Sequence, residues 1–333
     1  MRRRAGLRKL PVLLLLLVFV AVMFTVPRAL SDKASAPFLG IDDGRTGNEP
    51  SGSSDVPEVN ASPLPTAPSA DPPGTVNDIG FITVRMGISD IAGGNLILVN
   101  RDIRYDIPDE HGFVAIADHK TSSYMVTSSG MLLAAPAIEA LNSMMDAFFT
   151  ETGNETIAVI SGFRDFDKQL DTLAEYTALM GYTEALRWVA PPGFSEHQAG
   201  LAVDLGIQSD GALRTFYGEG VYGWFAQNCV EFGFVLRYPE DKTDITGNAH
   251  EPWHFRYVGD PHAYIMNRDD LCLEEYIDSV RDFTFEDPLR VDLDGVMYLV
   301  YFVEGFDVPV PFDCEFDISG NNVDGFIVTL RVA

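Results

Sequence analysis

The sequence has 333 residues, of which 46% are hydrophobic, so it can bury the core of one sizeable domain with attachments. Its formal net charge of -26 argues against nucleic acid as a partner, because no basic stripe is available to neutralise phosphates. The three cysteines, Cys229, Cys272 and Cys314, are too widely spaced for a zinc knuckle and indicate no disulfide framework.

The first 30 residues indicate a targeting segment. Basic residues between positions 2 and 9 precede an apolar run from Leu10 to Val26, which is typical of a secretory signal or a signal anchor. Pro37 follows the nearest small-residue cleavage site, Ala34-Ser35-Ala36, and disfavours cleavage there. We therefore expect residues 1–30 to form an uncleaved, single-pass membrane anchor that leaves the rest of the chain extracellular. If the segment is cleaved, the protein is secreted.

Residues 31–76 are rich in Ser, Pro, Gly, Ala and Asp and have few large apolar side chains. Such a composition cannot bury enough surface to fold, so it indicates a disordered tether. Beyond the tether, short strands are expected at 81–84 and 96–100, with turn residues between them. Apolar residues at helical spacing then predict a helix over 135–149.

A buried strand is expected at 156–160, followed by a helix with one apolar face. That face is expected to carry Leu170, Leu173, Tyr176, Leu179 and Met180.

The next segments carry the residues of greatest chemical interest. Asp204 lies within the apolar run 201–207, which predicts a strand, and a helix is expected at 221–232. Segment 251–258 also predicts a strand, because Pro252 is poor inside a helix and the aromatic residues recur at every second position. These mixed elements show no regular βαβ alternation. They favour an α+β domain over residues 77–281, built on an antiparallel sheet with flanking helices.

After residue 281 the pattern changes to strands separated by Gly, Asn, Asp and Pro turns. Residues 296–302 and 325–330 are the clearest of these strands. We expect residues 282–333 to form a small all-β appendage, and no catalytic group stands out within it.

Four side chains suggest a metal centre. His197 and Asp204 flank a small-residue turn, and Glu251 and His254 follow about fifty residues later. A carboxylate inside an apolar strand needs a cation or several hydrogen bonds to offset its desolvation. Two histidines and one aspartate can hold a catalytic zinc ion with an open position for water, and Glu251 is a spare carboxylate for the proton of that water.

Three blocks of sequence carry a family resemblance. They are Ser-Gly-Phe-Arg-Asp-Phe-Asp-Lys-Gln from 161, Ser-Glu-His-Gln-Ala-Gly-Leu-Ala-Val-Asp from 195, and Glu-Pro-Trp-His-Phe-Arg-Tyr-Val-Gly from 251. In this order they closely resemble the VanY-type D-alanyl-D-alanine carboxypeptidases, which belong to a zinc peptidase group that includes VanX dipeptidases and LdcB-type L,D-carboxypeptidases. The resemblance covers about residues 81–280 and implies the LAS or hedgehog-type zinc peptidase fold.

The resemblance also implies roles for single residues. It makes His197, Asp204 and His254 the ligands of Zn²⁺ and Glu251 the general base. It makes Arg164 a catalytic group that faces the substrate carbonyl or carboxylate, and Gln169 and Ser195 further substrate contacts. The implied substrates are peptidoglycan stem peptides or their precursors, from which the terminal D-Ala is removed.

Several alternatives stay open at this point. Phe163 stands where many relatives have Tyr, and His250 where Tyr is common, so the substrate preference is open. L,D-carboxypeptidase action on tetrapeptide stems is the nearest alternative. A mononuclear iron oxygenase also uses two histidines and a carboxylate, but its first two ligands are usually closer in sequence. A non-catalytic wall-binding module is the remaining class, and the presence of Glu251 argues against it.

Overall fold

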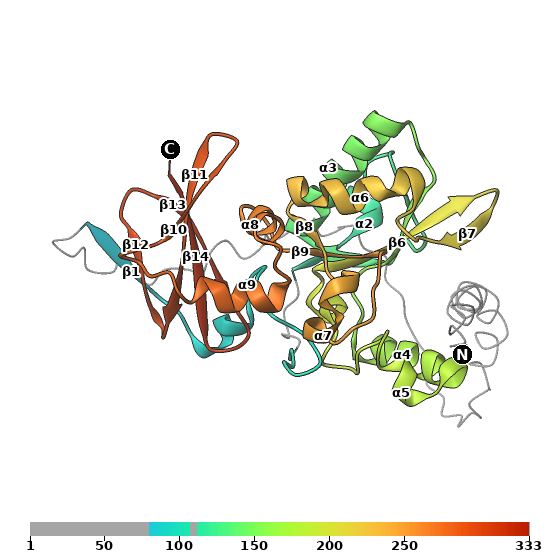
Figure 1. Cartoon of the computed structure of the whole chain (residues 1–333), viewed down its shortest axis with the longest axis horizontal. Coiled ribbons are helices and arrows are strands. Elements are labelled where there is room, and N and C mark those ends of the chain that lie inside the picture. Colours follow the sequence, from blue (N-terminus) through green and yellow to red (C-terminus); the bar gives the residue numbers. More distant parts are fainter. Residues whose placement is uncertain (1–79, 107–111, 333) are drawn as a thin grey trace, which may run out of the picture. The chain divides into compact units, whose positions relative to one another are not determined.

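The computed structural model of the chain describes residues 80–106 and 112–332 (Figure 1). All of these residues belong to one compact unit. The basic residues, the apolar run and the tether that we expect before residue 77 lie outside the described residues. Within the described ranges, no helix combines the length and the apolar character needed to cross a membrane.

A six-stranded sheet holds the centre of the fold. Five strands lie in the order β3 (Met125–Val126), β5 (Ile157–Ser161), β6 (Ala202–Ser209), β9 (His254–Tyr257) and β8 (Phe234–Leu236). The sixth, β7 (Ala212–Thr215), pairs with the far half of β6. β3 and β5 run parallel, whereas the other pairs are antiparallel. The predicted α+β class with an antiparallel sheet and flanking helices is therefore confirmed.

The helix expected at 135–149 is present as α3 (Ala135–Thr152) and lies against one face of this sheet (Figure 1). Its buried side chains pack in one core with strand residues such as Val203 and Leu205 of β6. The buried side chains of α3 are those of Ala137, Ile138, Leu141, Met144, Met145 and Phe148. Each large apolar side chain buried in this way stabilises the fold by about 1.5–3 kcal/mol.

The second long helix, α4 (Phe166–Met180), buries a different face from the one predicted. Leu173 and Tyr176 are buried as expected, but Leu170 is 48% exposed and Leu179 is 36% exposed. Gln169 is wholly buried in their place, and its amide nitrogen, Nε2, donates to the carbonyl of Ala190 at 2.7 Å. The prediction failed because this helix is fixed partly by a polar contact to a loop, which apolar spacing does not reveal.

Two predicted strands also differ from the structure. Residues 96–100 are not a strand, although Leu96 to Val99 are buried. Their backbone is paired with a distant turn and a side chain instead: Leu98 N donates to Asn321 O at 3.0 Å, and Ile97 O accepts from Arg256 at 2.8 Å. β9 begins only at His254, so Glu251 lies in the turn before the strand.

The helix expected at 221–232 is divided into a 3-10 turn, a short α-helix and a second 3-10 turn: η4 (Gly220–Tyr222), α6 (Gly223–Asn228) and η5 (Cys229–Phe232). The other short elements are η2 (Ile88–Ala92), β2 (Phe113–Ala115), α2 (Ile116–His119), β4 (Leu132–Ala134), α5 (Tyr182–Ala185), η3 (Glu196–Ala199), η6 (Glu240–Lys242), α7 (Thr243–Thr246), α8 (His262–Arg268) and α9 (Leu273–Val280).

The C-terminal strands form a sheet of their own. Its order is β10 (Leu289–Leu293), β11 (Val296–Glu304), β14 (Gly325–Val332) and β13 (Glu315–Gly320), with every pair antiparallel. The remaining strand, β12 (Asp307–Pro311), pairs with β1 (Phe81–Arg85) in a separate two-stranded ladder. The first described strand of the chain therefore pairs with the C-terminal part and not with the central sheet.

The C-terminal sheet shares a hydrophobic core with α8 and α9. Leu273 and Ile277 of α9 belong to the same buried cluster as Val300 of β11 and Ile327 of β14. His262, at the start of α8, lies within this region and is 4% exposed. Its Nδ1 is 2.6 Å from the Tyr276 hydroxyl, and its Nε2 is 3.0 Å from the Thr329 hydroxyl on β14.

This histidine should make the stability of the protein depend on pH. Burial lowers the pKa of His262 to about 3, whereas a histidine in an unfolded chain has a pKa of about 6.5. The unfolded chain therefore binds the proton first, and the contribution of the neutral buried ring is lost as the pH falls below 6.5. Between pH 6.5 and 5 this loss should reach roughly 2 kcal/mol.

Urea unfolding of wild type and His262→Gln at both pH values measures the effect. The difference between their unfolding free energies should shrink on going from pH 6.5 to pH 5. An unchanged difference would show that His262 does not stay neutral in the folded protein.

Candidate metal centre

The structure brings His197, Asp204 and His254 together. One donor atom from each lies within 4.8 Å of the other two, and all three side chains are buried. His197 comes from η3, Asp204 from β6 and His254 from the first position of β9. Asp204 Oδ2 is 3.1 Å from His197 Nε2, and Asp204 Oδ1 is 3.0 Å from His254 Nδ1. The aspartate therefore lies between the two imidazoles.

The sheet and one tight turn set this arrangement. Asp204 and His254 are directly opposed in the antiparallel pairing of β6 with β9. His197 reaches them because the chain turns back at Gly200, which has a positive φ of 65°. A Cβ atom at Gly200 would lie 2.5 Å from the ring of Phe113, so both the backbone conformation and the packing require glycine there.

Three buried polar atoms around this cluster have no hydrogen-bond partner among the residues that the structure describes. They are Glu251 Oε1, Arg164 Nε and His197 Nε2, whose 3.1 Å contact with Asp204 Oδ2 lacks hydrogen-bond geometry. The other ring nitrogen of His197, Nδ1, is bonded to the carbonyl oxygen of Gly162 at 2.7 Å, which leaves Nε2 as its lone-pair atom. Buried polar groups are normally paired, so this set fits a site that holds a cation and a polar ligand.

The charges within the cluster differ from residue to residue. Burial alone would raise the pKa of Asp204, but the two imidazoles hold it well below its usual value. Burial lowers the pKa of His197 to about 4, and the nearby Arg164 acts in the same direction. Burial opposes protonation of His254 as well, but hydrogen bonds to Asp204 and Glu196 raise its pKa to about 9. Asp204 is therefore a carboxylate, which is the form that binds a metal ion.

Glu251 lies beside the cluster without belonging to it. It is 4% exposed, and its Oε2 is 3.8 Å from His254 Nδ1. Burial raises the pKa of Glu251 to about 8, although His254 acts against this shift. A buried carboxyl group beside the donor cluster can both accept and release a proton, which suits a general base and acid.

The predicted substrate contacts occupy different positions. Arg164 follows β5, and its backbone N donates to the carbonyl of His197 at 3.1 Å. Burial lowers the pKa of Arg164, while Asp204 and Glu251 are among the groups that raise it. Ser195 is buried at the N-terminal end of η3, next to the cluster in sequence. Gln169 lies on α4, where Nε2 is engaged with Ala190 and its Oε1 has no partner among the described residues. The substrate roles of these three residues stay predictions.

Sequence reasoning missed a buried ionic network behind the metal cluster. Glu196 Oε1 accepts from Arg237 Nε and from Arg256 at 2.7 Å each. Arg237 also forms a bidentate salt bridge with Glu274 of α9, with N–O distances of 2.7 and 2.8 Å. Glu196 and Arg256 lie inside the quoted sequence blocks next to ligand positions. The signal available in the sequence was an acidic residue, Glu196, next to His197 and a basic residue, Arg256, two positions after His254.

A buried set of two histidines and one aspartate on an antiparallel sheet, with a separate carboxyl group beside it, defines a metallopeptidase-type hydrolase. The family described as VanY, D-alanyl-D-alanine carboxypeptidase, matches residues 130–260. A D-alanyl-D-alanine carboxypeptidase of Enterococcus faecium is 34% identical over 245 residues, which are 71% of this chain and 75% of the relative. The chain therefore belongs to the VanY family of D-alanyl-D-alanine carboxypeptidases.

Two further comparisons agree with this family. A D-alanyl-D-alanine carboxypeptidase of Enterococcus faecalis (strain ATCC 700802 / V583) is 47% identical over 130 residues, which are 36% of this chain and 47% of the relative. The crystal structure of the vancomycin resistance D,D-dipeptidase VanXYg with a D-Ala-D-Ala phosphinate analog is 30% identical, with a TM-score of 0.68. The match covers 76% of this chain and 99% of that one. The predicted family, fold and enzyme class are confirmed.

Proposed function

We propose that the chain is a zinc-dependent D-alanyl-D-alanine carboxypeptidase that removes the terminal D-Ala from peptidoglycan stem peptides. The observation that carries this proposal is the convergence of His197, Asp204 and His254, with Glu251 buried beside them. The curated relatives, which are named for D-alanyl-D-alanine, favour this substrate over the L,D-linked tetrapeptide.

The donor set supports zinc as the metal. Two imidazole nitrogens and one carboxylate oxygen are the three protein ligands of many catalytic zinc sites, which keep a fourth position open. A zinc ion held by His197, Asp204 and His254 would polarise the scissile carbonyl and lower the pKa of a bound water towards 7. The protein then needs no nucleophilic side chain of its own.

Glu251 is the residue that would move the proton. Its carboxylate is beside the donor cluster and its Oε1 has no partner among the described residues, so this oxygen is available to the attacking water. After taking the proton of that water, Glu251 can give it to the departing amine of D-Ala. Proton transfer by a positioned side chain of this kind typically contributes about 10²–10⁴ to the rate.

Arg164 would provide fixed positive charge at the same place. Its guanidinium interacts electrostatically with both Asp204 and Glu251, and its buried Nε has no partner among the described residues. A guanidinium offers several donors in a rigid plane, which suits the carbonyl oxygen or the terminal carboxylate of a peptide. We assign Arg164 to stabilise the negative charge that develops on the scissile carbonyl oxygen.

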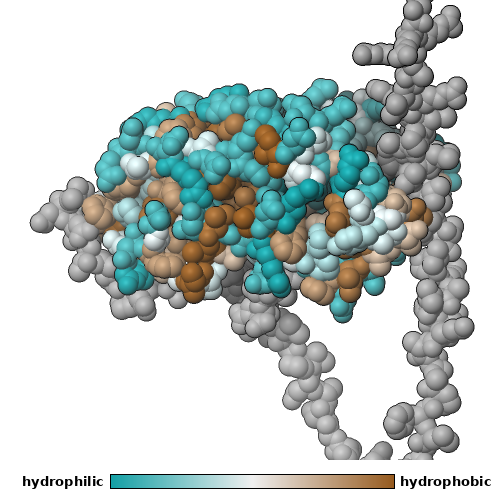
Figure 2. Space-filling view, turned by 60° about the horizontal axis from the view of Figure 1, so that its bottom comes forward, coloured by the Kyte–Doolittle hydropathy of each residue, from teal (hydrophilic) through white to brown (hydrophobic). Residues whose placement is uncertain are grey.

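Two exposed apolar side chains follow Arg164 in the sequence. Phe166 and Leu170, one turn apart at the start of α4, are 49% and 48% exposed. Figure 2 shows one face of the protein, on which apolar patches are interrupted by hydrophilic residues. α4 begins two residues after Arg164, so these two exposed side chains lie close to it along the chain.

We also propose that the catalytic part works outside the membrane. The support is the sequence of residues 1–30, where a basic flank precedes the apolar run Leu10–Val26. Such a segment directs the following residues across the membrane, where stem peptides of the wall are exposed.

Defined stem peptides test the reaction. Purified protein incubated with a pentapeptide ending in D-Ala-D-Ala should release free D-Ala, detected by mass spectrometry. A chelator should abolish the release because it removes the metal, and added Zn²⁺ should restore it. A tetrapeptide stem is the control substrate. Release that is independent of metal, or faster cleavage of the tetrapeptide, would contradict the proposal.

The role of Glu251 can be separated from metal binding. Glu251→Gln keeps the shape of the side chain but removes the proton acceptor, so kcat should fall by about 10²–10⁴. The variant should still bind zinc, measured by metal analysis after gel filtration. Glu184→Gln is a matched control, because Glu184 is partly exposed and pairs with Arg187 at the surface. Wild-type turnover in Glu251→Gln would remove Glu251 from the mechanism.

The location can be tested with the full chain in cells. Membrane fractions should retain the protein, and protease added to intact spheroplasts should digest the part after residue 30. Replacing the basic residues at positions 2–9 by neutral ones should reduce this exposure, because they set the orientation of the segment. Protection of the catalytic part in intact spheroplasts would contradict an extracellular site.

A further inference from the structure

Glu196 precedes the predicted ligand His197 in sequence but faces the other histidine, His254. It is 1% exposed, and its Oε2 lies 3.5 Å from His254 Nε2. Its other oxygen accepts from Arg237 and Arg256 at 2.7 Å each. Two guanidinium groups thus pair with the same carboxylate oxygen, which holds Glu196 as a carboxylate behind the metal centre.

The ring of His254 has two different surroundings. Nδ1 faces the donor cluster, with Asp204 Oδ1 at 3.0 Å and Glu251 Oε2 at 3.8 Å. Nε2 points the opposite way, toward Glu196. A neutral imidazole carries one proton, and the nitrogen without it is the one that can bind a metal ion. With a cation bound, Asp204 would turn its lone pairs to the ion, so Glu196 is then the carboxylate that can accept the ring proton, on Nε2.

We propose that Glu196 is a positioning residue for His254: it accepts the Nε2 proton, and so leaves the Nδ1 lone pair free to bind the metal ion. This inference rests on the proposed zinc site and assigns the residue that prepares one of its ligands. Partners of this kind fix the ring orientation and increase the basicity of a ligand histidine.

The two ligand histidines are held in different ways. His197 Nδ1 donates to the backbone carbonyl of Gly162 at 2.7 Å, which is a neutral acceptor. His254 has a charged acceptor, which forms the stronger type of hydrogen bond. The structure therefore assigns Nε2 of His197 and Nδ1 of His254 as the two ligand nitrogens.

Glu196 is itself held by a chain of buried contacts. Arg237, which donates to Glu196, also donates two hydrogen bonds to Glu274 of α9. Asn100 donates to Glu274 at 3.1 Å. Glu274 lies beyond residue 260, where the VanY match ends. The position of a metal ligand thus depends on a helix that packs with the C-terminal sheet.

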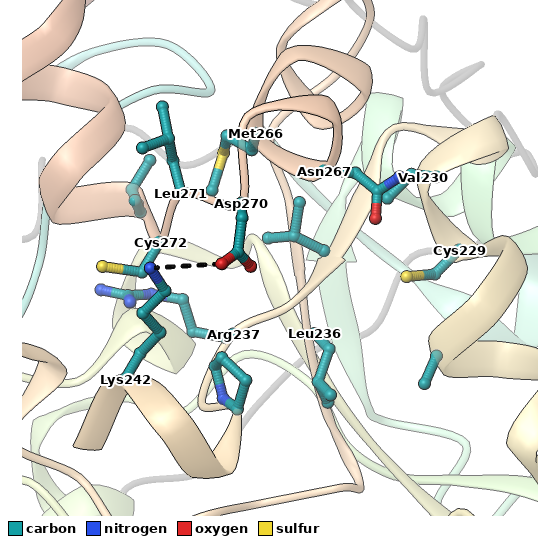
Figure 3. Close-up of a pocket in the computed structure, with 14 residues that line it drawn as sticks. Cys229, Val230, Leu236, Arg237, Lys242, Met266, Asn267, Asp270, Leu271 and Cys272 are labelled. Atoms are coloured by element: carbon teal, nitrogen blue, oxygen red, sulfur yellow. Dashed lines mark ion pairs between the residues drawn. The ribbon is translucent and has the colours of Figure 1, made fainter.

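Arg237 also borders a separate cavity of about 180 Å³, shown in Figure 3. Its lining includes Lys242, Asp270 and Cys272, and the ion pair between Lys242 and Asp270 spans it at 3.9 Å. None of the four predicted metal-centre residues lines this cavity. Arg237 is therefore part of the wall between the cavity and the network that holds His254.

Glu196→Gln tests the proposal directly. The glutamine oxygen can still accept from the two arginines, but its amide group then faces His254 Nε2 and can only donate. The ring proton must move to Nδ1, where it competes with the metal. The dissociation constant for Zn²⁺, measured by competition with a fluorescent chelator, should rise about 10- to 100-fold.

Glu184→Gln is the control, because it makes the same change at a surface carboxylate that pairs with Arg187. Its zinc dissociation constant should stay close to that of wild type, and thermal unfolding of both variants shows whether they fold. Equal zinc dissociation constants for folded Glu196→Gln and wild type would overturn the positioning role. A wild-type protein that binds no zinc would instead overturn the proposed zinc site.

A second measurement uses the wild-type protein and does not depend on how a variant folds. Long-range ¹⁵N NMR spectra of histidine-labelled, zinc-loaded protein identify the protonated nitrogen of each ring. One ligand histidine should be bound through Nδ1 with its proton on Nε2, and the other through Nε2 with its proton on Nδ1. Two ligand histidines that are both bound through Nε2 would contradict the proposal.

Discussion

The pairing of β6 with β9 is the constraint on which the site depends. It sets Asp204 directly opposite His254, and the 3.0 Å contact between their side chains follows from that register. A shift of the pairing by one residue would turn one of the two side chains to the other face of the sheet. The apolar core beneath the sheet, which includes Val203 and Phe255, opposes such a shift because these residues alternate with the site residues.

When several charged side chains are buried together, each positive charge needs a negative charge close to it. Glu196 and Glu274 are matched by Arg237 and Arg256, and every one of these charges has a close partner. Breaking a buried pair is costly because it leaves a charge without compensation, so the network holds one geometry. Asp204 has no arginine at ion-pair distance among the described residues. The negative charge of Asp204 is thus available to a cation.

The sequence predicted the parts of the protein that follow from strong local patterns. Histidine, aspartate and glutamate in blocks with family-specific spacing indicated the metal centre, and apolar spacing indicated α3. The sequence did not indicate the buried face of α4, because the contact of Gln169 with Ala190 joins residues that are 21 positions apart. The same reason explains the error at 96–100, whose apolar residues are buried by tertiary contacts without a neighbouring strand. The role of Glu196 needed the structure, since its partners lie 41, 58 and 60 residues away.

The ladder between β1 and β12 has a mechanical consequence. Phe81 to Arg85 pairs residue by residue with Pro311 to Asp307, at the point where the described chain begins. Any pull exerted on the protein from its N-terminal side must load these hydrogen bonds before it reaches the central sheet. Because β12 belongs to the C-terminal strands, that load passes first into them and not into η3, β6 and β9, which carry the candidate metal centre.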